Sequence, residues 1–254
     1  MISVCIATHN AEKYILEQLG SILSQLSTND EVIISDDGSK DGTLKLIESL
    51  RDDRIRILHY EQKVNYSKKK LSSYYYATSN FYNALLAAKG DVIFLSDQDD
   101  RWYGNKVKIS LSYLQDCDIV CSNFSIMDGN GTLLQREFWE QGRFSQMNIL
   151  QVLKYLPFRG CCLAFKKEVL ENAFPFPEAL FLHDCWIGLN AVFSGFRYKF
   201  IDTPLILYRR HETNVSSLES PNSTFFKVWY RLKLLYQLMI LRLKRAINKR
   251  SNKY

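Results

Sequence analysis

Three carboxylates follow an apolar run in the segment LSDQDD, which spans residues 95–100. The run Gly90–Leu95 is typical of a strand that enters the core, so we expect the acids at its carboxyl end. Open α/β sheets bind their ligands at that edge. Asp97 and Asp99 stand at alternate positions and suit a hard divalent cation, which prefers oxygen ligands and can bridge to a diphosphate. Taken alone, the segment is equally compatible with an ordinary acidic loop.

A second polar cluster, DDGSKDGT at residues 36–43, follows another apolar run. An exposed Asp36 or Asp37 can accept hydrogen bonds from a nucleobase imide or a ribose hydroxyl, and the glycines allow a close turn beside a ligand. The alternative is a plain turn that ends in a helix cap. The choice between the two depends on the other clusters of the chain.

Two further clusters combine acids, bases and aromatic rings. The sequence HDCW at residues 183–186 opens an expected helix, where Asp184 is either a helix cap or a general base toward an incoming hydroxyl. The sequence YRRH at residues 208–211 follows a short expected strand. Its paired arginines can neutralise a diphosphate, and His211 can complete a metal site or contact the phosphates. A solvated charge cluster is the alternative for this segment.

Strands and helices are expected to alternate along the first half of the chain. The expected strands are 2–7, 31–35, 54–58, 90–95 and 119–122, and the expected helices are 14–23, 43–50, 80–89 and 105–114. This alternation predicts an α/β fold whose mostly parallel sheet carries helices on both faces. After residue 123 the alternation is weaker. The expected elements there are a hairpin turn at 128–131, strands at 161–165, 198–201 and 205–208, and a helix at 182–193.

The positive charge of the chain is concentrated at its carboxyl end. The 254 residues carry 33 basic and 27 acidic side chains, but no acid follows Glu219 and nine basic residues do. The first 219 residues therefore have a balance of −3, which argues against a nucleic-acid-binding surface. The six cysteines form no CxxC pair, so we expect reduced core residues in a cytosolic protein. We expect no signal peptide, because the expected first strand begins at residue 2. We expect no membrane span, because no uncharged apolar run approaches ~20 residues.

The basic tail from Phe225 onward is expected to form an amphipathic helix. Five of its cations fall within a sector of about 60° on a helical projection: Lys227, Arg231, Arg242, Arg245 and Lys249. Such a helix suits the surface of an anionic membrane, where it would lie in the interface. A helix packed on the preceding domain or on a dimer partner, with solvated cations, is the alternative.

Five motifs, taken in order, resemble those of the inverting glycosyltransferases of family 2. They are SVCIATHN at 3–10, DDGS at 36–39, DQDD at 97–100, HDCW at 183–186 and YRRH at 208–211. The resemblance covers about residues 1–216 and looks closest to the bacterial rhamnosyltransferase-like branch. It implies a GT-A fold, a Rossmann-like α/β architecture that binds a nucleoside-diphosphate sugar, with Mn²⁺ or Mg²⁺ as cofactor.

The resemblance also assigns roles on the donor side of the site. Thr8 and Asn10 would line the nucleotide pocket, with Asp36 on the base and Asp37 on the ribose side. The diphosphate and the metal would be held by four residues: Asp97, Asp99, Arg210 and His211. Asp99 would be the principal metal ligand, and Asp97 and His211 would complete the metal site.

On the acceptor side, the resemblance makes Asp184 the catalytic base. His183 and Trp186 would line the pocket for the acceptor or the transferred sugar. Gly160 would belong to the same pocket, because RGCC at 159–162 resembles the glycine-containing strand of the family near the donor sugar.

These roles predict an inverting, metal-dependent enzyme of bacterial surface-polysaccharide biosynthesis. It would move a sugar from dTDP-rhamnose or a UDP-hexose to a hydroxyl of a glycan or lipid-linked acceptor. One alternative is a sugar-nucleotide nucleotidyltransferase, which is disfavoured because THNAEK at 8–13 contains no glycine. The other is a catalytically inactive sugar-nucleotide-binding protein.

The sequence also predicts a division of the chain. A GT-A domain would occupy residues 1–216, with a nucleotide-binding half at about 1–122 and an acceptor-binding half at about 123–216. A linker at 217–224 would join it to the basic helical tail at 225–254. The protein would be cytoplasmic and attached peripherally to the inner membrane through this tail, and a homodimer is left open.

Overall fold

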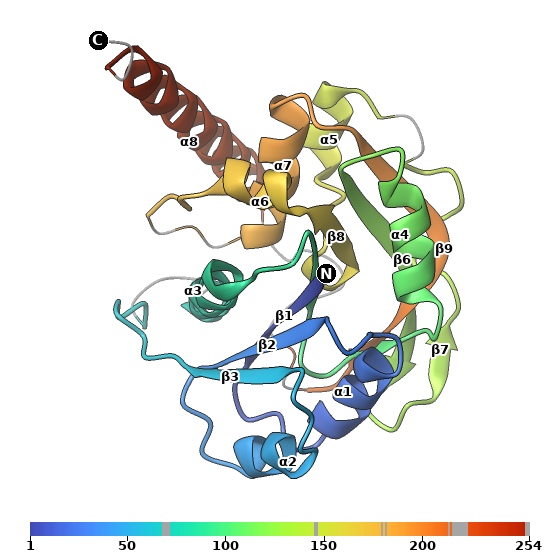
Figure 1. Cartoon of the computed structure of the whole chain (residues 1–254). Helices are drawn as coiled ribbons and strands as arrows, with labels where there is room; N and C mark the ends of the chain where they lie inside the picture. The colour runs from blue at the N-terminus through green and yellow to red at the C-terminus, as the bar shows by residue number, and fades with distance from the viewer. Residues whose placement is uncertain are drawn as a thin grey trace. The chain divides into compact units, whose positions relative to one another are not determined.

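The computed structural model describes residues 1–67, 72–144, 147–178, 180, 182–212, 214 and 223–251, with side chains in the last helix described as far as Arg245. The chain divides into two compact units, Met1–Thr213 and Asn214–Tyr254. The first unit is built on a mixed sheet, and the described part of the second is a long helix (Figure 1). Of the predicted linker at 217–224, only Ser223 and Thr224 lie within the described residues.

One sheet forms the core of the first unit. Its strands are β1 (Ile2–Thr8), β2 (Glu31–Asp36), β3 (Ile55–His59), β4 (Val92–Ser96), β5 (Arg101–Trp102), β6 (Ile119–Asp128), β7 (Leu133–Gln135), β8 (Leu163–Lys166) and β9 (Tyr198–Arg210). Their order is β3-β2-β1-β4-β8-β6-β9-β5, and β7 pairs with β6. Strands β3, β2, β1 and β4 are parallel, as are β6 and β9, whereas β8 is antiparallel to both of its neighbours. The α/β fold and the mostly parallel sheet are therefore as predicted.

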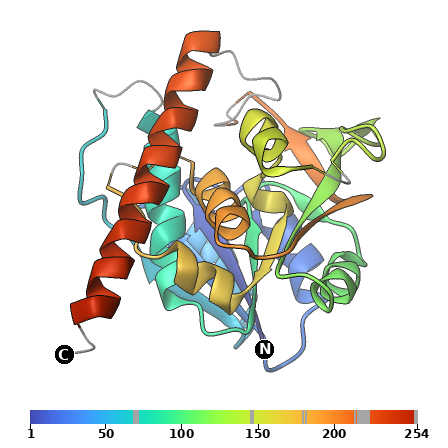
Figure 2. The same ribbon diagram turned by 90° about the horizontal axis from the view of Figure 1, so that it is seen from above.

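Helices pack on both faces of this sheet. They are α1 (Ile15–Leu23), α2 (Thr43–Ser49), α3 (Ser72–Ala87), α4 (Lys106–Leu114), α5 (Ile149–Tyr155), α6 (Lys167–Ala173) and α7 (His183–Phe193). Helix α3 contacts β1 and β2, and α1 and α2 lie on the opposite side of these strands (Figures 1 and 2). Helix α4 contacts β6, β8 and β9.

The central strands are buried on both faces, which explains why their sequences read as continuous apolar runs. Val4 on β1, Ile33 on β2 and Phe94 on β4 expose no surface. All six cysteines are free and buried. Burial of this kind leaves the polar residues of β1, β2 and β4 at the ends of the strands.

Those polar ends meet at one edge of the sheet. Thr8 ends β1, Asp36 ends β2 and Ser96 ends β4, and the three strands are parallel neighbours. Strand β9 runs in the same direction, because β8 reverses the direction between β4 and β6 and β9 is parallel to β6. Arg210, at the end of β9, therefore reaches the same edge as the acids that follow β4.

The second half of the sheet is more regular than the sequence predicts. Strand β6 continues to Asp128, although we expected it to end at 122, and β9 is one strand where we expected two. The two strands pair along their lengths, with register shifts around Asn123. Pairing between segments about 80 residues apart thus stabilises stretches whose local pattern is weak.

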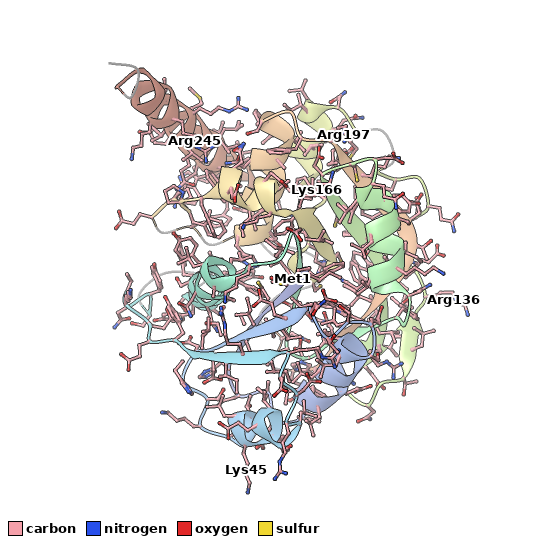
Figure 3. All side chains as sticks on the ribbon, viewed as in Figure 1. Met1, Lys45, Arg136, Lys166, Arg197 and Arg245 are labelled. Carbon is pink, nitrogen blue, oxygen red and sulfur yellow. The ribbon has the colours of Figure 1, made fainter. Side chains whose placement is uncertain are left out.

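Asp118 joins three strands at the opposite edge of the sheet. Its Oδ1 lies 3.1 Å from Nζ of Lys166 at the end of β8, and its Oδ2 accepts a hydrogen bond of 2.9 Å from the backbone N–H of Arg197, just before β9. Lys166 and Arg197 are both labelled in Figure 3. Burial raises the pKa of Asp118, but the bonds from Arg197 and Lys166 outweigh burial and lower it overall.

The second unit contains helix α8 (Thr224–Ser251), as the amphipathic pattern of the tail predicts. Large apolar side chains are exposed along it: Phe225, Val228, Trp229, Leu232, Tyr236, Met239 and Leu243. Among the described residues, no helix is both long enough and apolar enough to cross a membrane.

Candidate active site

Two loops at the carboxyl edge of the sheet hold each other in place. Thr8 is buried, and its hydroxyl donates to Oδ1 of Asp36 at 3.1 Å. The backbone N–H of Asn10 donates to the Ser39 hydroxyl at 2.9 Å, and the Asn10 side-chain oxygen accepts from the backbone N–H of Lys40 at 2.8 Å. Asn10 adopts a left-handed backbone conformation with φ 51°. The predicted nucleotide residues therefore form one connected loop pair.

Asp36 uses its carboxylate to shape its own loop. It is 2% exposed and accepts hydrogen bonds from the backbone N–H and the hydroxyl of Ser39. Asp37 is half-buried and accepts a hydrogen bond of 2.6 Å from the side chain of Gln62. Burial raises the pKa of Asp37, and the bond from Gln62 acts against that rise. Of the two predicted ligand contacts, Asp37 therefore presents the more accessible carboxylate.

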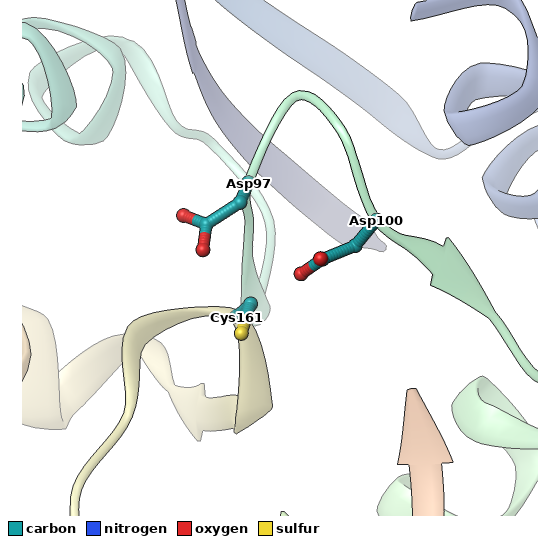
Figure 4. Close-up of side chains that lie close together, drawn as sticks. All are labelled: Asp97, Asp100 and Cys161. Atoms are coloured by element: carbon teal, nitrogen blue, oxygen red, sulfur yellow. The ribbon is translucent and has the colours of Figure 1, made fainter. Parts of the chain in front are cut away.

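The acids after β4 form a buried group with a cysteine (Figure 4). One ligand atom from each of Asp97, Asp100 and Cys161 lies within 4.8 Å of the others. Asp100 exposes no surface; its Oδ1 accepts from the backbone N–H of Arg209 at 3.0 Å, and its Oδ2 has no hydrogen-bond partner. Burial and the nearby charge of Asp99 raise the pKa of Asp97 to about 7. The charge of Arg159 acts against this rise, but burial and Asp99 outweigh it.

Asp99 faces the end of β9. Its Oδ2 lies 2.7 Å from Nε2 of His211, and both side chains are largely buried. The preceding Arg209 is 2% exposed and donates to the Asp99 carbonyl at 2.8 Å and to Glu17 on α1. Arg210 is half-buried. Arg209, which the sequence predicted only as one of two arginines for a diphosphate, thus fixes the loop that carries Asp99.

These residues fit a divalent cation. Carboxylate oxygens and an imidazole suit Mg²⁺ or Mn²⁺, and a cation would relieve the repulsion between the acids and satisfy Oδ2 of Asp100. The predicted metal set was Asp99, Asp97 and His211. In the structure two members of that set, Asp99 and His211, are in contact, and Asp97 lies with Asp100 and Cys161. The RGCC segment was expected near the donor sugar, but a place for Cys161 beside the acids was not predicted, because the approach of η1 (Gly160–Cys162) to β4 depends on the antiparallel β8.

Asp184 lies in the first turn of α7, facing η1. Its Oδ2 accepts a hydrogen bond of 3.1 Å from the backbone N–H of Gly160, and its Oδ1 accepts one of 2.7 Å from its neighbour Cys185. The side chain is half-buried. A β-carbon on Gly160 would lie 3.8 Å from that of Asp184 and 3.3 Å from Nε2 of His183. Gly160 therefore lets the chain approach both residues closely.

His183 lies next to Asp184 and packs against α3. It stacks on Phe81 with 4.3 Å between ring centroids, and its Nδ1 lies 3.3 Å from the Thr78 hydroxyl. Its Nε2 is buried without a hydrogen-bond partner. Burial lowers the pKa of His183, which favours the uncharged form. The ring therefore offers one free nitrogen on the side of Gly160.

Trp186 does not fit the predicted sugar pocket. It exposes no surface, and its indole N–H donates to the backbone oxygen of Ala173 on α6 at 2.9 Å. The ring follows the inner face of α7, so it packs in the core and leaves Asp184 on the outer face. The assignment of Trp186 to an acceptor wall is therefore corrected to a packing role.

Arg159 is a residue whose importance the sequence did not reveal. Its guanidinium lies over three aromatic rings, 4.7 Å from the centroid of Phe124, 5.1 Å from Tyr208 and 5.9 Å from Phe138. It immediately precedes the Gly160 that binds Asp184. Its charge acts against the rise in the pKa of Asp97, which is caused chiefly by burial.

Comparison with known proteins identifies the family. Residues 3–174 match the glycosyl transferase family 2 model, which covers more than half of the chain. The chain therefore belongs to glycosyl transferase family 2, as its motifs predict. The side chains gathered at the sheet edge, among them Asp97, Asp99 and His211, are therefore those of a family 2 glycosyltransferase.

Similar sequences occur in several bacteria. The dTDP-rhamnosyl transferase RfbG of Shigella flexneri is 29% identical over 82% of this chain and 72% of its own length. The Escherichia coli WfaP, a UDP-Glc:alpha-D-GlcNAc-diphosphoundecaprenol beta-1,3-glucosyltransferase, is 27% identical over 85% of this chain and 80% of its own. An uncharacterized glycosyltransferase of Nostoc sp. is 27% identical, and this chain spans 66% of its length.

The fold matches a solved glycosyltransferase. Staphylococcus aureus TarS 1–349, in complex with UDP-GlcNAc, superimposes with a TM-score of 0.66 at 21% identity. The match covers 92% of this chain and 66% of that chain. The likeness shows that the chain has the GT-A type of α/β fold, as predicted.

Proposed function

We propose that this protein is an inverting glycosyltransferase that moves a sugar from a nucleoside-diphosphate sugar to a hydroxyl of a lipid-linked saccharide. The observation that supports this most is the position of η1 between two acidic groups. Gly160 donates to Asp184, and the next residue, Cys161, lies with Asp97 and Asp100. A base and a cation-binding group on either side of one short turn are what a single displacement at an anomeric carbon requires.

In the proposed reaction Asp184 acts as the general base. Its carboxylate takes the proton of the acceptor hydroxyl, whose oxygen forms a bond to the anomeric carbon. The bond from that carbon to the diphosphate oxygen breaks, and its electron pair leaves with the diphosphate. Attack and departure occur on opposite faces, so the configuration inverts without a covalent intermediate. The hydrogen bonds from Gly160 and Cys185 orient the base.

The leaving diphosphate needs positive charge beside it. A divalent cation, when bound by Asp97, Asp99 and His211 with Asp100 alongside, would neutralise the charge that grows on the diphosphate. Arg210 would add a bidentate contact to its oxygens. Arg209 holds the Asp99 carbonyl and so keeps the ligand loop in place.

The relatives suggest which substrates to test. RfbG is named for dTDP-rhamnose, and WfaP for UDP-glucose and a GlcNAc-diphospholipid. We therefore propose these two donors and a sugar diphospholipid acceptor for this chain. Such an acceptor is part of bacterial surface-polysaccharide biosynthesis and lies in a membrane.

Helix α8 would bring the enzyme to that membrane as a peripheral protein on the cytoplasmic side. On a helical projection, Arg231 and Arg242 flank one side of its exposed apolar residues, and Lys233 and Lys244 flank the other. Cations on both sides of an apolar face suit a helix that lies in an anionic interface.

The experiment incubates the full-length protein with each donor, Mn²⁺ and a synthetic GlcNAc-diphospholipid, and follows nucleoside diphosphate and glycosylated lipid. Asp184→Asn should lower the transfer rate by about 10²–10⁴-fold while donor binding persists. Asp116→Asn, at an exposed acid after α4, is the matched control and should leave the rate unchanged. Transfer that survives in Asp184→Asn refutes the mechanism. Pyrophosphate formed from a nucleoside triphosphate and a sugar 1-phosphate would support the nucleotidyltransferase alternative.

A further inference from the structure

Arg159 immediately precedes η1, the short turn that contacts both Asp184 and the group of Asp97 and Asp100. The next residue, Gly160, donates its N–H to Asp184, and the one after, Cys161, belongs to the group with Asp97 and Asp100. The side chain of Arg159 starts from extended backbone just before η1. It is therefore a cation at the junction between the base and the cation-binding acids.

Three aromatic rings border this guanidinium, and the charges of Asp97 and Asp184 also act on it. Phe124 on β6, Tyr208 on β9 and Phe138 present their rings to it at centroid distances of 4.7, 5.1 and 5.9 Å. Cation–π contacts stabilise a positive charge that lies over such rings. These contacts involve no oxygen acceptor, so they use no N–H group of the guanidinium in a hydrogen bond to oxygen.

Those N–H groups have no partner within the described part of the chain. No hydrogen-bond acceptor and no carboxylate within 4.0 Å meets the guanidinium of Arg159. Arg209 differs, because its guanidinium donates hydrogen bonds to Asp99, Gly129 and Glu17. Arg159 is half-buried, so an anion that reaches this position could take up hydrogen bonds that the described residues leave unmade.

We propose that Arg159 binds phosphate oxygens at the junction of the donor and acceptor sides of the site. Its planar group matches two oxygens of one phosphate, and the aromatic rings fix its orientation before the ligand arrives. Two sources carry this chemistry: the diphosphate of the donor and a phosphate on the acceptor sugar. The choice between these sources rests on the proposed function, whereas phosphate binding itself does not.

The test measures binding in the absence of divalent cations and of any transfer. In EDTA, the full-length protein is titrated with UDP and uridine, and separately with GlcNAc 1-phosphate and methyl N-acetylglucosaminide. The wild-type protein should bind the phosphate-bearing probe of at least one pair more tightly than its neutral partner. Arg159→Gln should reduce that ratio by about tenfold or more, which corresponds to one charge-assisted contact.

The matched control is Arg143→Gln. Arg143 also lies over an aromatic ring, 5.6 Å from the centroid of Phe144, but its side chain is exposed. This variant should keep the wild-type ratios. Arg159→Lys keeps the charge but loses the planar pair of donors, so it should give an intermediate ratio, and it serves as the test if Arg159→Gln does not fold.

The outcomes separate the sources. A reduced ratio for UDP over uridine assigns Arg159 to the donor, and a reduced ratio for GlcNAc 1-phosphate assigns it to the acceptor. The proposal is overturned if the wild-type protein shows no preference for phosphate in either pair. It is also overturned if a folded Arg159 variant keeps the wild-type ratio, with its affinities for the neutral and the phosphate-bearing probe unchanged or lowered equally. If the wild-type protein transfers no sugar but the probe ratios behave as expected, the result counts against the proposed function alone.

Discussion

The carboxylates at the sheet edge differ in how far the protein already uses their hydrogen-bonding capacity. Asp36 accepts bonds from Thr8 and Ser39 within its own loop pair. Asp100 bonds the Arg209 N–H with one oxygen and leaves the other unpartnered. A carboxylate with a free buried oxygen is costly to ionise, so the acids after β4 are the ones that gain most from a cation.

The Asp99–His211 pair leads to a prediction about metal affinity. Asp99→Asn should weaken the binding of Mn²⁺ by about tenfold or more, because a direct ligand loses its charge. Calorimetric titration without donor or acceptor measures this. Asp53→Asn, at an exposed acid, should match the wild type. Unchanged affinity in Asp99→Asn would place the metal elsewhere.

Among the elements, α7 depends on a close contact with the segment before η1. A β-carbon built on Gly188 would lie 2.3 Å from the ring of Phe158. Gly188→Ala should therefore lower the free energy of unfolding by about 1–3 kcal/mol, measured by urea denaturation. Gly20→Ala in α1, where nothing lies within 4 Å, should raise it by about 0.5–1 kcal/mol. If the two substitutions change the free energy of unfolding equally, the packing described for α7 is contradicted.

Asp118 gives a prediction about the edge that β6, β8 and β9 share. Its pKa is lower in the folded protein than its usual 3.8, so its contribution to stability is present above that pH and lost as the pH falls through the folded value. Asp118→Asn should cost about 1 kcal/mol at pH 7, because its partner Arg197 is largely exposed. The difference from wild type should shrink toward acid pH in urea melts. A pH-independent difference would exclude this electrostatic cause.

Strand β9 illustrates how far elements follow from sequence. Two consecutive arginines, Arg209 and Arg210, are alike in sequence, and alternation along a strand sends them to opposite faces. Arg209 is buried against Glu17 and the loop of Asp99, whereas Arg210 is half-buried. Which of the two turns inward depends on the register between β9 and β6, and local sequence does not specify that register.

At the scale of the whole molecule, α8 yields a prediction about membranes. The full-length protein should sediment with vesicles that contain phosphatidylglycerol and less with phosphatidylcholine alone, and added salt should weaken binding. Leu232→Asp should reduce binding, because Leu232 is 60% exposed on the apolar face of α8. Leu134→Asp, at a similarly exposed residue on β7, should not. Equal binding to both kinds of vesicle would refute an electrostatic interface.

The sequence by itself determined the family, the α/β class and the acids Asp97, Asp99 and Asp184 as candidates for chemistry. It could do so because buried parallel strands impose continuous apolar runs, and because motif residues stand directly after those runs. The tertiary structure alone decided that Trp186 packs in the core, that Asp100 and Cys161 lie with Asp97, and that Arg159 lies over the rings of Phe124 and Tyr208. The physical reason is that β8 inserts antiparallel between β4 and β6, and this pairing joins segments about 70 and 45 residues apart that share no local signal.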